Sequence, residues 1–230
     1  MGKSKRVLRV GIIRFPCSNC DFDALHFFQK FGHKPEFIWY KETKLKDFDL
    51  LVLPGGFAFG DRVYKKATAK YVIDPGTQAL TSPVMEVVKK AAKNGTPILG
   101  ICNGFQILVK AGLLPGKLVQ NKSKKFFCDW TTCKIVGNSI FGDKSLLNKL
   151  LKLPVAHGYG NYQVTKKEFE KLEDNGQIFV QYQGLNPNGS YKNIAGVSNE
   201  KETIFGLMPH PERSPDGKYF ISAIEKYVNK

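Results

Sequence analysis

The run from Thr96 to Gln106 constrains the fold of this chain most, because two structural patterns meet there at one cysteine. Residues 97–101 are a short apolar run typical of a buried strand, and residues 105–111 place apolar side chains at helical spacing before Gly112. Cys102 therefore falls on a strand-to-helix turn, with glycines two positions before and two positions after it. Glycines there leave room for a sharp turn that exposes the thiol at the carboxyl end of the strand.

This position favours a nucleophilic role for Cys102. The unpaired N–H groups of a helix N-terminus would face the sulfur and favour the thiolate, which is the form that attacks carbon. The alternative is a buried structural cysteine.

Strand and helix patterns alternate around this turn and predict an α/β fold. Short apolar strands joined by helices are typical of a doubly wound, mostly parallel sheet flanked by helices, where ligands gather at the carboxyl ends of the strands. Alternation over residues 126–136 and the turn Asn186-Pro187-Asn188-Gly189 predict an additional small antiparallel edge sheet. We expect residues 1–230 to form a single domain. The expected strands are 7–13, 36–40, 49–53, 97–101, 178–183, 194–197 and 203–208, and the expected helices are 21–31, 83–93, 105–111 and 217–228.

The net charge of +15 raises the question of nucleic-acid binding. Only five of the 35 basic residues are arginines, and no segment combines arginine with interleaved aromatic residues. This favours a lysine-rich solvated surface over nucleic-acid recognition and leaves an acidic protein partner open. No apolar run approaches the roughly 18 residues of a membrane span, and five cysteines do not suit a disulfide framework. We therefore expect a cytoplasmic protein with no membrane contact and no disulfide.

A cysteine that attacks an amide needs a base, and four histidines are available. His210 is the best candidate because it stands between two prolines after a strand, with Glu212 placed to hold its tautomer. A surface His-Glu pair in a proline-rich turn is the alternative. For His26 and His33 we expect capping or half-buried roles. His157 lies in a glycine-flanked loop that could line the site.

The attacked amide also needs hydrogen-bond donors. Gly55 and Gly56 follow the third strand with bare backbone N–H groups, and Asn103 comes directly after the nucleophile. We expect Gly56 and Asn103 to form the oxyanion hole, with Gly55 beside the substrate. Gln106, one helical turn beyond Cys102, can face the same pocket and contact a polar substrate, or it can simply solvate the helix.

A metal or nucleotide site finds little support in the sequence. Cys17 and Cys20 could bind zinc together with Cys128 and Cys133, but the latter two fall on opposite faces of a strand-like run. We therefore expect no metal. No phosphate-binding loop of the Gly-x-x-x-x-Gly-Lys type occurs.

The order and spacing of these motifs resemble those of the class I glutamine amidotransferases. Within that family, the chain is most similar to the glutaminase subunits of phosphoribosylformylglycinamidine synthase in purine biosynthesis, and the resemblance covers nearly the whole chain. The segments that carry it are Phe15-Pro16, Ser18-Asn19-Cys20-Asp21, residues 53–61, Gly100-Ile101-Cys102-Asn103-Gly104-Phe105-Gln106, Ala156-His157-Gly158, Asn186-Pro187-Asn188-Gly189-Ser190 and residues 207–213.

The resemblance implies a reaction. Cys102 would attack the side-chain amide of glutamine, His210 would shuttle the proton, Glu212 would orient His210, and water would release glutamate from the thioester. By the same resemblance, Gly56 and Asn103 would be oxyanion donors and Gln106 a glutamine contact. Ammonia would pass to a separate synthetase subunit that makes formylglycinamidine ribonucleotide with ATP, often through a small bridging subunit. ATP and magnesium would bind that partner, so no cofactor is expected in this chain.

Three segments depart from the family pattern. The family usually has glycine at the place of Cys17, an Arg-Ala-Gly segment at the place of residues 62–67, and glutamate at the place of Tyr159. These departures leave two alternatives open, namely a different ammonia acceptor and a catalytically silent basic scaffold.

Overall fold

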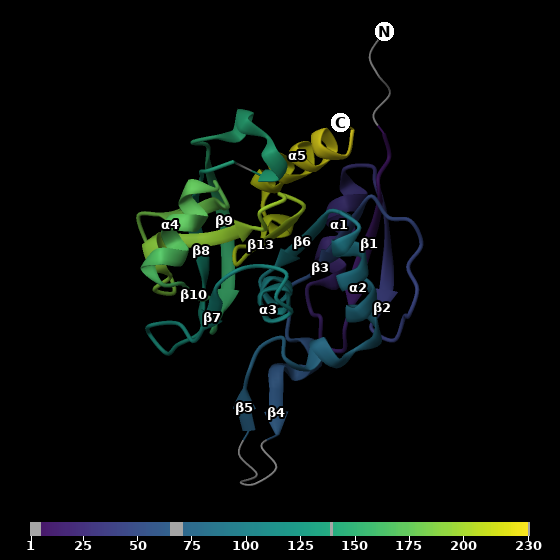
Figure 1. Cartoon of the computed structure of the whole chain (residues 1–230), viewed down its shortest axis with the longest axis horizontal. Coiled ribbons are helices and arrows are strands. Elements are labelled where there is room, and N and C mark those ends of the chain that lie inside the picture. The colour runs from purple at the N-terminus through teal and green to yellow at the C-terminus, as the bar shows by residue number, and fades with distance from the viewer. Residues whose placement is uncertain (1–5, 65–70, 139, 230) are drawn as a thin grey trace.

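A nine-stranded sheet forms the centre of the computed structural model, which describes residues 6–64, 71–138 and 140–229 (Figure 1). The strand order is β2-β1-β3-β6-β13-β12-β11-β8-β9. The first five strands in this order run parallel, and the last four are antiparallel to their neighbours. Their bounds are β1 Arg9–Arg14, β2 Lys34–Trp39, β3 Leu50–Leu53, β6 Ile98–Ile101, β8 Phe127–Ile135, β9 Leu150–His157, β11 Ile178–Gln183, β12 Ile194–Ser198 and β13 Ile204–Leu207.

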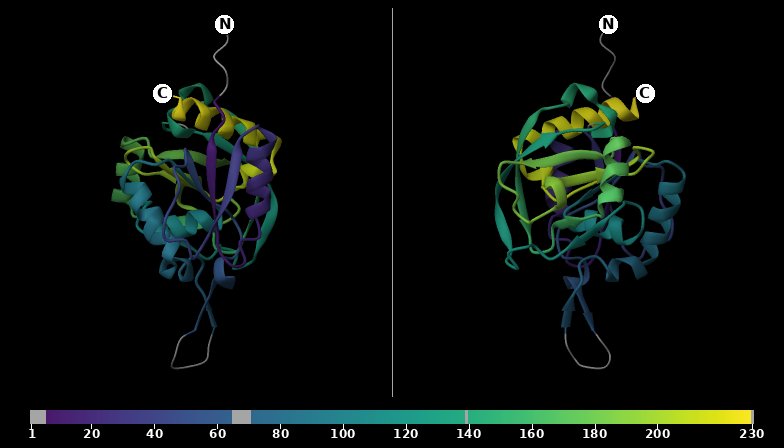
Figure 2. Two further views of the ribbon diagram at one scale, coloured as in Figure 1. Left: turned by 90° about the vertical axis from the view of Figure 1, so that its right-hand side faces the viewer. Right: turned by 60° about the vertical axis from the view of Figure 1, so that its left-hand side comes forward.

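Helices cover both faces of the sheet. In the left view of Figure 2, α1 lies on one side of the parallel strands and α2 and α3 lie on the other. The bounds of the helices are α1 Asp21–Lys30, α2 Pro83–Lys93, α3 Asn103–Lys110, α4 Lys166–Asp174 and α5 Lys218–Val228. Short 3₁₀ turns lie at Ala58–Asp61, Gln78–Thr81, Ile140–Gly142, Lys144–Leu146, Tyr191–Asn193, Pro211–Arg213 and Pro215–Gly217. This layering confirms the predicted doubly wound fold.

The central parallel strands are apolar because both of their faces are covered. All four residues of β3, β6 and β13 are buried. The register pairs Gly100 of β6 with Leu53 of β3 on one side and with Gly206 of β13 on the other. The three strands therefore end at the same edge of the sheet, and the residues that follow them meet there.

Two small two-stranded sheets complete the fold. One pairs β10 (Asn161–Gln163) with β7 (Lys117–Val119), and the other pairs β4 (Arg62–Tyr64) with β5 (Tyr71–Ile73). The β4–β5 hairpin extends away from the rest of the chain (Figure 1). The lysines at 65 and 66, which belong to one departure from the family pattern, lie outside the described residues.

The segment around His157 differs from its prediction. His157 is the last residue of β9 rather than part of a loop. β9 pairs with β8 over its whole length, and its side chains alternate in burial as they do in a strand with one covered face. No helix within the described part of the chain is long and apolar enough to cross a membrane.

Candidate active site

Cys102 lies on the sharp turn between β6 and α3, with φ of 49° and ψ of −103°. Few side chains adopt this backbone conformation. Cys102 is 5% exposed, so the thiol is buried rather than exposed as predicted, and its sulfur lies 3.8 Å from the Ala156 carbonyl oxygen. A Cβ atom on Gly104 would lie 1.9 Å from the carbonyl oxygen of Leu53, and one on Gly100 would lie 2.9 Å from the carbonyl carbon of Gly104. The glycines on both sides of the cysteine are therefore needed for close packing, as predicted.

His210 and Glu212 form a buried pair beside Cys102. His210 Nδ1 lies 2.7 Å from Glu212 Oε1, and the two side chains are 2% and 1% exposed. The backbone N–H of His210 donates to the Pro154 carbonyl at 2.9 Å, and the N–H of Cys102 donates to the Leu207 carbonyl at 2.8 Å. These bonds hold the base and the nucleophile at the ends of adjacent strands. The alternative of a surface His-Glu pair is therefore wrong.

The charge state of His210 follows from its neighbours. Burial alone would lower its pKa, but the Glu212 carboxylate and Cys102 outweigh burial and raise the pKa to about 10. His157 has the opposite environment, because burial and the nearby His210 lower its pKa to about 4. A charged imidazole thus lies close to a neutral one, and only the charged one has a carboxylate partner.

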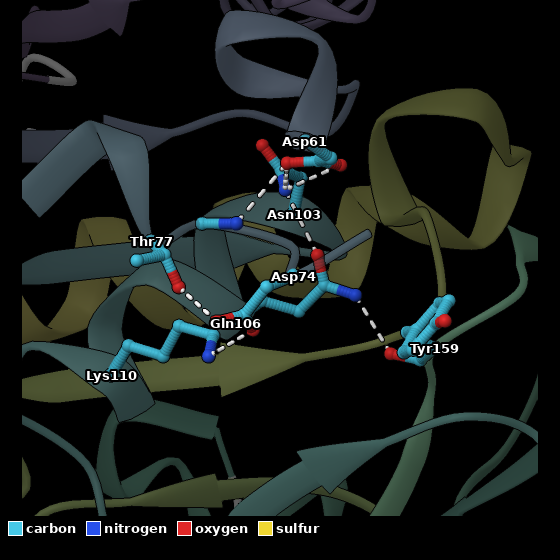
Figure 3. A network of polar contacts seen from close by, with 8 residues as sticks. Asp61, Asp74, Thr77, Asn103, Gln106, Lys110 and Tyr159 are labelled. Atoms are coloured by element: carbon cyan, nitrogen blue, oxygen red, sulfur yellow. Dashed lines mark hydrogen bonds and ion pairs between the residues drawn. The ribbon is translucent and has the colours of Figure 1, made fainter. Parts of the chain in front are cut away.

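Asn103 and Gln106 belong to a chain of polar contacts on the first turn of α3 (Figure 3). Asn103 Oδ1 accepts the N–H of Ala58 at 3.0 Å, while Asn103 Nδ2 donates to Gln106 Oε1 at 2.9 Å and to the Asp61 carboxylate at 3.2 and 3.3 Å. Gln106 Nε2 donates to the Tyr159 carbonyl at 2.7 Å. We call Asp61, Asn103, Gln106 and the Tyr159 carbonyl the amide relay.

A cavity of about 260 Å³ opens beside the thiol, and we call it the Cys102 cavity. Gly56, Cys102, Gln106 and His157 all line it, whereas Asn103 is not among its lining residues. The remaining lining residues are Phe57, Asp61, Pro75, Gln120, Lys124, Lys125, Phe126, Ala156, Gly158 and Tyr159. Its volume and its polar groups suit a small, polar ligand.

The two glycines after β3 have different surroundings. Gly56 has φ of +129°, and a Cβ atom on it would lie 2.4 Å from the backbone nitrogen of Asn19. Gly55 is not among the residues lining the Cys102 cavity; a Cβ atom on it would lie 2.7 Å from His210 Cε1. Gly55 therefore makes room for the imidazole, whereas Gly56 borders the cavity.

The remaining cysteines are all free. Cys128 is exposed and Cys133 is buried, on opposite faces of β8 as expected. Among the described residues, one group has ligand atoms close enough to hold a metal ion, namely Cys20, His210 and Glu212, within 4.8 Å of one another. Arg213 Nη2 lies 3.2 Å from the Cys20 sulfur, and burial raises the pKa of this thiol to about 12. A guanidinium and a neutral thiol at this position oppose cation binding.

The other two histidines, His26 and His33, do not line the Cys102 cavity. His33 is buried, with its Nε2 3.0 Å from Glu225 Oε1 and its Nδ1 accepting the N–H of Leu8 at 3.3 Å. It therefore joins the start of β1 to α5, which is a more buried role than predicted. His26 is exposed on α1.

Asp61 and the Tyr159 carbonyl are not among the site residues predicted from the sequence. Asp61 directly follows the glycine-rich segment after β3, a position that could have indicated a role in the site. Tyr159 contributes its backbone carbonyl, which every residue type has, so the residue type at this position could not indicate the contact.

Comparisons with known proteins agree with this geometry. Residues 7–223 match the family described as CobB/CobQ-like glutamine amidotransferase domain. The chain is 43% identical over 209 residues to phosphoribosylformylglycinamidine synthase subunit PurQ of Wolinella succinogenes, covering 90% of this chain and 91% of that protein. It is also 43% identical over 230 residues to subunit PurQ of Alkaliphilus metalliredigens, covering 96% and 97%. The structure of PurLQS from Thermotoga maritima is similar at a TM-score of 0.83 and 36% identity, covering 97% of this chain and 100% of that chain.

Proposed function

Because this chain belongs to the glutamine amidotransferase family of PurQ subunits of phosphoribosylformylglycinamidine synthase, we propose that it hydrolyses glutamine at Cys102 and supplies the ammonia to a synthetase subunit. The observation that carries this proposal is the buried His210–Glu212 pair beside a cysteine on a strained turn. We further propose that residues 1–230 form one amidotransferase domain.

The reaction follows from the positions of three side chains. The Cys102 sulfur attacks the amide carbon of glutamine, and His210 holds the proton that the thiol releases. His210 then gives this proton to the amide nitrogen as the C–N bond breaks, which leaves a thioester and free ammonia. Water, activated by the neutral imidazole, attacks the thioester, and glutamate leaves as the sulfur takes back a proton. Glu212 fixes the imidazole tautomer through Nδ1.

The walls of the Cys102 cavity supply the binding groups. We propose that the backbone N–H groups of Gly56 and Asn103 stabilise the oxyanion, which forms as sulfur adds to the amide carbon. Gln106 contacts the substrate from the first turn of α3. Gly55 acts beside the substrate by leaving space for His210, which lies directly against it.

The ammonia acceptor lies outside this chain. We propose that the partner is the synthetase subunit that makes formylglycinamidine ribonucleotide, that a small bridging subunit joins the complex, and that ATP and magnesium bind the synthetase. Four PurQ relatives with 42–45% identity support this acceptor over a different one. The complex would be cytoplasmic, and the net charge of +15 suits an acidic partner surface.

The substitution Cys102→Ala tests the proposal in the assembled complex. We expect glutamine-dependent amidine formation to fall by about 10³-fold or more, because the proposed thioester forms on the Cys102 sulfur. Ammonia-dependent formation should stay unchanged, since the synthetase needs only free ammonia. Cys128→Ala, at an exposed position on β8, is the matched control and should leave both activities intact. Glutamine-dependent activity that survives Cys102→Ala would contradict the proposal.

A further inference from the structure

Asp61 is a buried carboxylate that takes no part in the reaction described above. It lies at the start of the β4–β5 hairpin and is 5% exposed. Its carboxylate oxygens accept hydrogen bonds from Asn103 Nδ2 and from the backbone N–H of Gly76. Asp61 also lines the Cys102 cavity. A buried carboxylate is costly unless its contacts compensate for lost hydration, so its position requires an explanation.

The amide relay has a fixed direction. The backbone N–H of Ala58 can only donate, so the atom of Asn103 that faces it must be Oδ1. The carbonyl of Tyr159 can only accept, so the atom of Gln106 that faces it must be Nε2. Asn103 Nδ2 and Gln106 Oε1 therefore face each other in the middle, and the second Nδ2 proton goes to Asp61 (Figure 3).

This direction determines what Gln106 offers to a ligand. One Nε2 proton of Gln106 goes to the Tyr159 carbonyl, which leaves the other available to the cavity that the side chain lines. The carbonyl and the α-carboxylate of glutamine are hydrogen-bond acceptors, so an N–H donor is the correct group to meet them. A reversed carboxamide would present an oxygen to these groups and repel them.

We propose that Asp61 is a positioning residue that reinforces, from the middle of the amide relay, the direction that the Ala58 N–H and the Tyr159 carbonyl set at its ends, so that Gln106 presents an N–H donor to the glutamine substrate. The proposal rests on the proposed function. An ionised carboxylate has no proton to donate, so it accepts from Asn103 Nδ2 and disfavours the reversed carboxamide.

The surroundings of Asp61 give this role a pH dependence. Burial raises its pKa to about 6, against the hydrogen bonds from Gly76 and Asn103. Two charged groups also face it: Asp74, which raises the pKa, and Lys110 of α3, which lowers it. Asp61 therefore loses its charge in mildly acidic solution, and its ability to hold the relay should weaken there.

The test compares glutamine hydrolysis by the wild-type complex and by Asp61→Asn between pH 5 and pH 8. Asparagine tolerates the φ of 49° at this position, so the backbone should be retained. Its Oδ1 can still accept from Gly76 and Asn103, but its amino group would replace the Oδ2 that accepts from Asn103 Nδ2 at 3.3 Å. We expect KM for glutamine to rise about 10-fold at pH 8 with kcat changed less than about 2-fold. The ratio of wild-type to variant kcat/KM should approach one at pH 5, because wild-type Asp61 is then protonated. Titration of His210 affects both proteins and cancels in the ratio.

Asp74→Asn is the matched control. Asp74 lies at the other end of the hairpin, where its carboxylate contacts Lys110 and Thr77 and its backbone N–H donates to the Asp61 carbonyl at 3.2 Å. The substitution changes only the carboxylate and keeps this backbone bond. We expect wild-type KM at pH 8 in this variant. Loss of the Asp74 charge should also lower the pKa of Asp61, so the acid-side rise in KM should move to lower pH.

Labelling of Cys102 in the full chain separates this proposal from the proposed function. In Asp61→Asn, alkylation by iodoacetamide should match the wild type, whereas labelling by a glutamine-like electrophile should slow about 10-fold. A ratio of kcat/KM that does not change with pH, or an unchanged KM, would overturn the role of Asp61 alone. A wild-type chain that neither hydrolyses glutamine in the complex nor reacts with the glutamine-like electrophile would instead refute the proposed function.

Discussion

The substitution Gly104→Ala tests whether the close packing of α3 against β3 sets the position of the nucleophile. The added Cβ atom would lie 1.9 Å from the Leu53 carbonyl oxygen, so the first turn of α3 must move by more than about 1 Å to reach even 3.0 Å. Overpacking of this kind costs about 1–3 kcal/mol, which the better helix propensity of alanine offsets by about 1 kcal/mol. A displacement of about 1 Å at the reacting atoms lowers activity by about 100-fold. The loss of activity should therefore exceed what the loss of stability explains.

Two measurements on the same protein separate these effects. Glutamine-dependent amidine formation by the complex reports the nucleophile, and urea unfolding of the chain reports stability. Gly112→Ala, just beyond the other end of α3, is the control because nothing lies within 4 Å of the added atom. Its φ of +70° costs about 1 kcal/mol in a non-glycine residue, but activity should stay within about 2-fold of wild type. The reasoning is refuted if Gly104→Ala retains activity as well as Gly112→Ala does.

Three further substitutions give separate outcomes. Glu212→Gln removes the charge that raises the pKa of His210, so the acid limb of the pH profile of kcat/KM for glutamine hydrolysis should shift to lower pH. The rate of glutamine hydrolysis should fall about 100-fold or more. Ammonia-dependent activity should not change and serves as the reference. His157 is protonated in the unfolded chain below its ordinary pKa of 6.5 but in the folded chain only near 4, so the free energy of unfolding should fall by about 2 kcal/mol between pH 7 and pH 5. His157→Asn should flatten this fall in urea titrations at the two pH values, and an equally steep fall in the variant would assign it to other groups. Cys17 has φ of +66°, so Cys17→Gly should stabilise the chain by about 0.5–1 kcal/mol in urea unfolding, and a loss of stability would argue against backbone strain at this turn.

The parallel half of the fold could be predicted because its signals are local. Helix α2 begins at Pro83 and ends at Lys93 as predicted, since Ser82-Pro83 and Asn94-Gly95 mark its two ends. Strands β3 and β6 of the central sheet are continuous apolar runs, which a sheet covered on both faces requires. In such segments, residue type and burial agree at nearly every position.

In the elements that the sequence analysis missed, residue type and burial do not agree in this way. β9 contains Pro154, which interrupts the strand pattern, but β9 is an edge strand where a missing N–H is tolerated. Helix α4 buries only Leu172 and is made almost entirely of charged residues, so it offers few apolar positions from which a helix could be recognised. Its one clear signal is the capping box, in which Thr165 and Glu168 exchange side-chain and backbone hydrogen bonds.

The site residues also differ in whether a local sequence signal identifies them. Cys102 could be identified from its own segment, because the glycines that it needs lie two residues away on each side. His210 could be assigned as its base because one proline-flanked turn holds both the histidine and Glu212. The amide relay draws on three separate segments, and the sequence does not show that these segments meet.

Tyr159 shows why this distinction matters for the departures from the family pattern. A tyrosine in place of the usual glutamate changes the side chain at the rim of the Cys102 cavity, which would be a serious change if the relay ended on that side chain. Gln106 instead donates to the backbone carbonyl of Tyr159, which every residue type supplies. The direction of the relay is therefore set by groups that the substitution leaves unchanged, and the departure can alter the surface that meets a partner without altering how Gln106 faces the substrate.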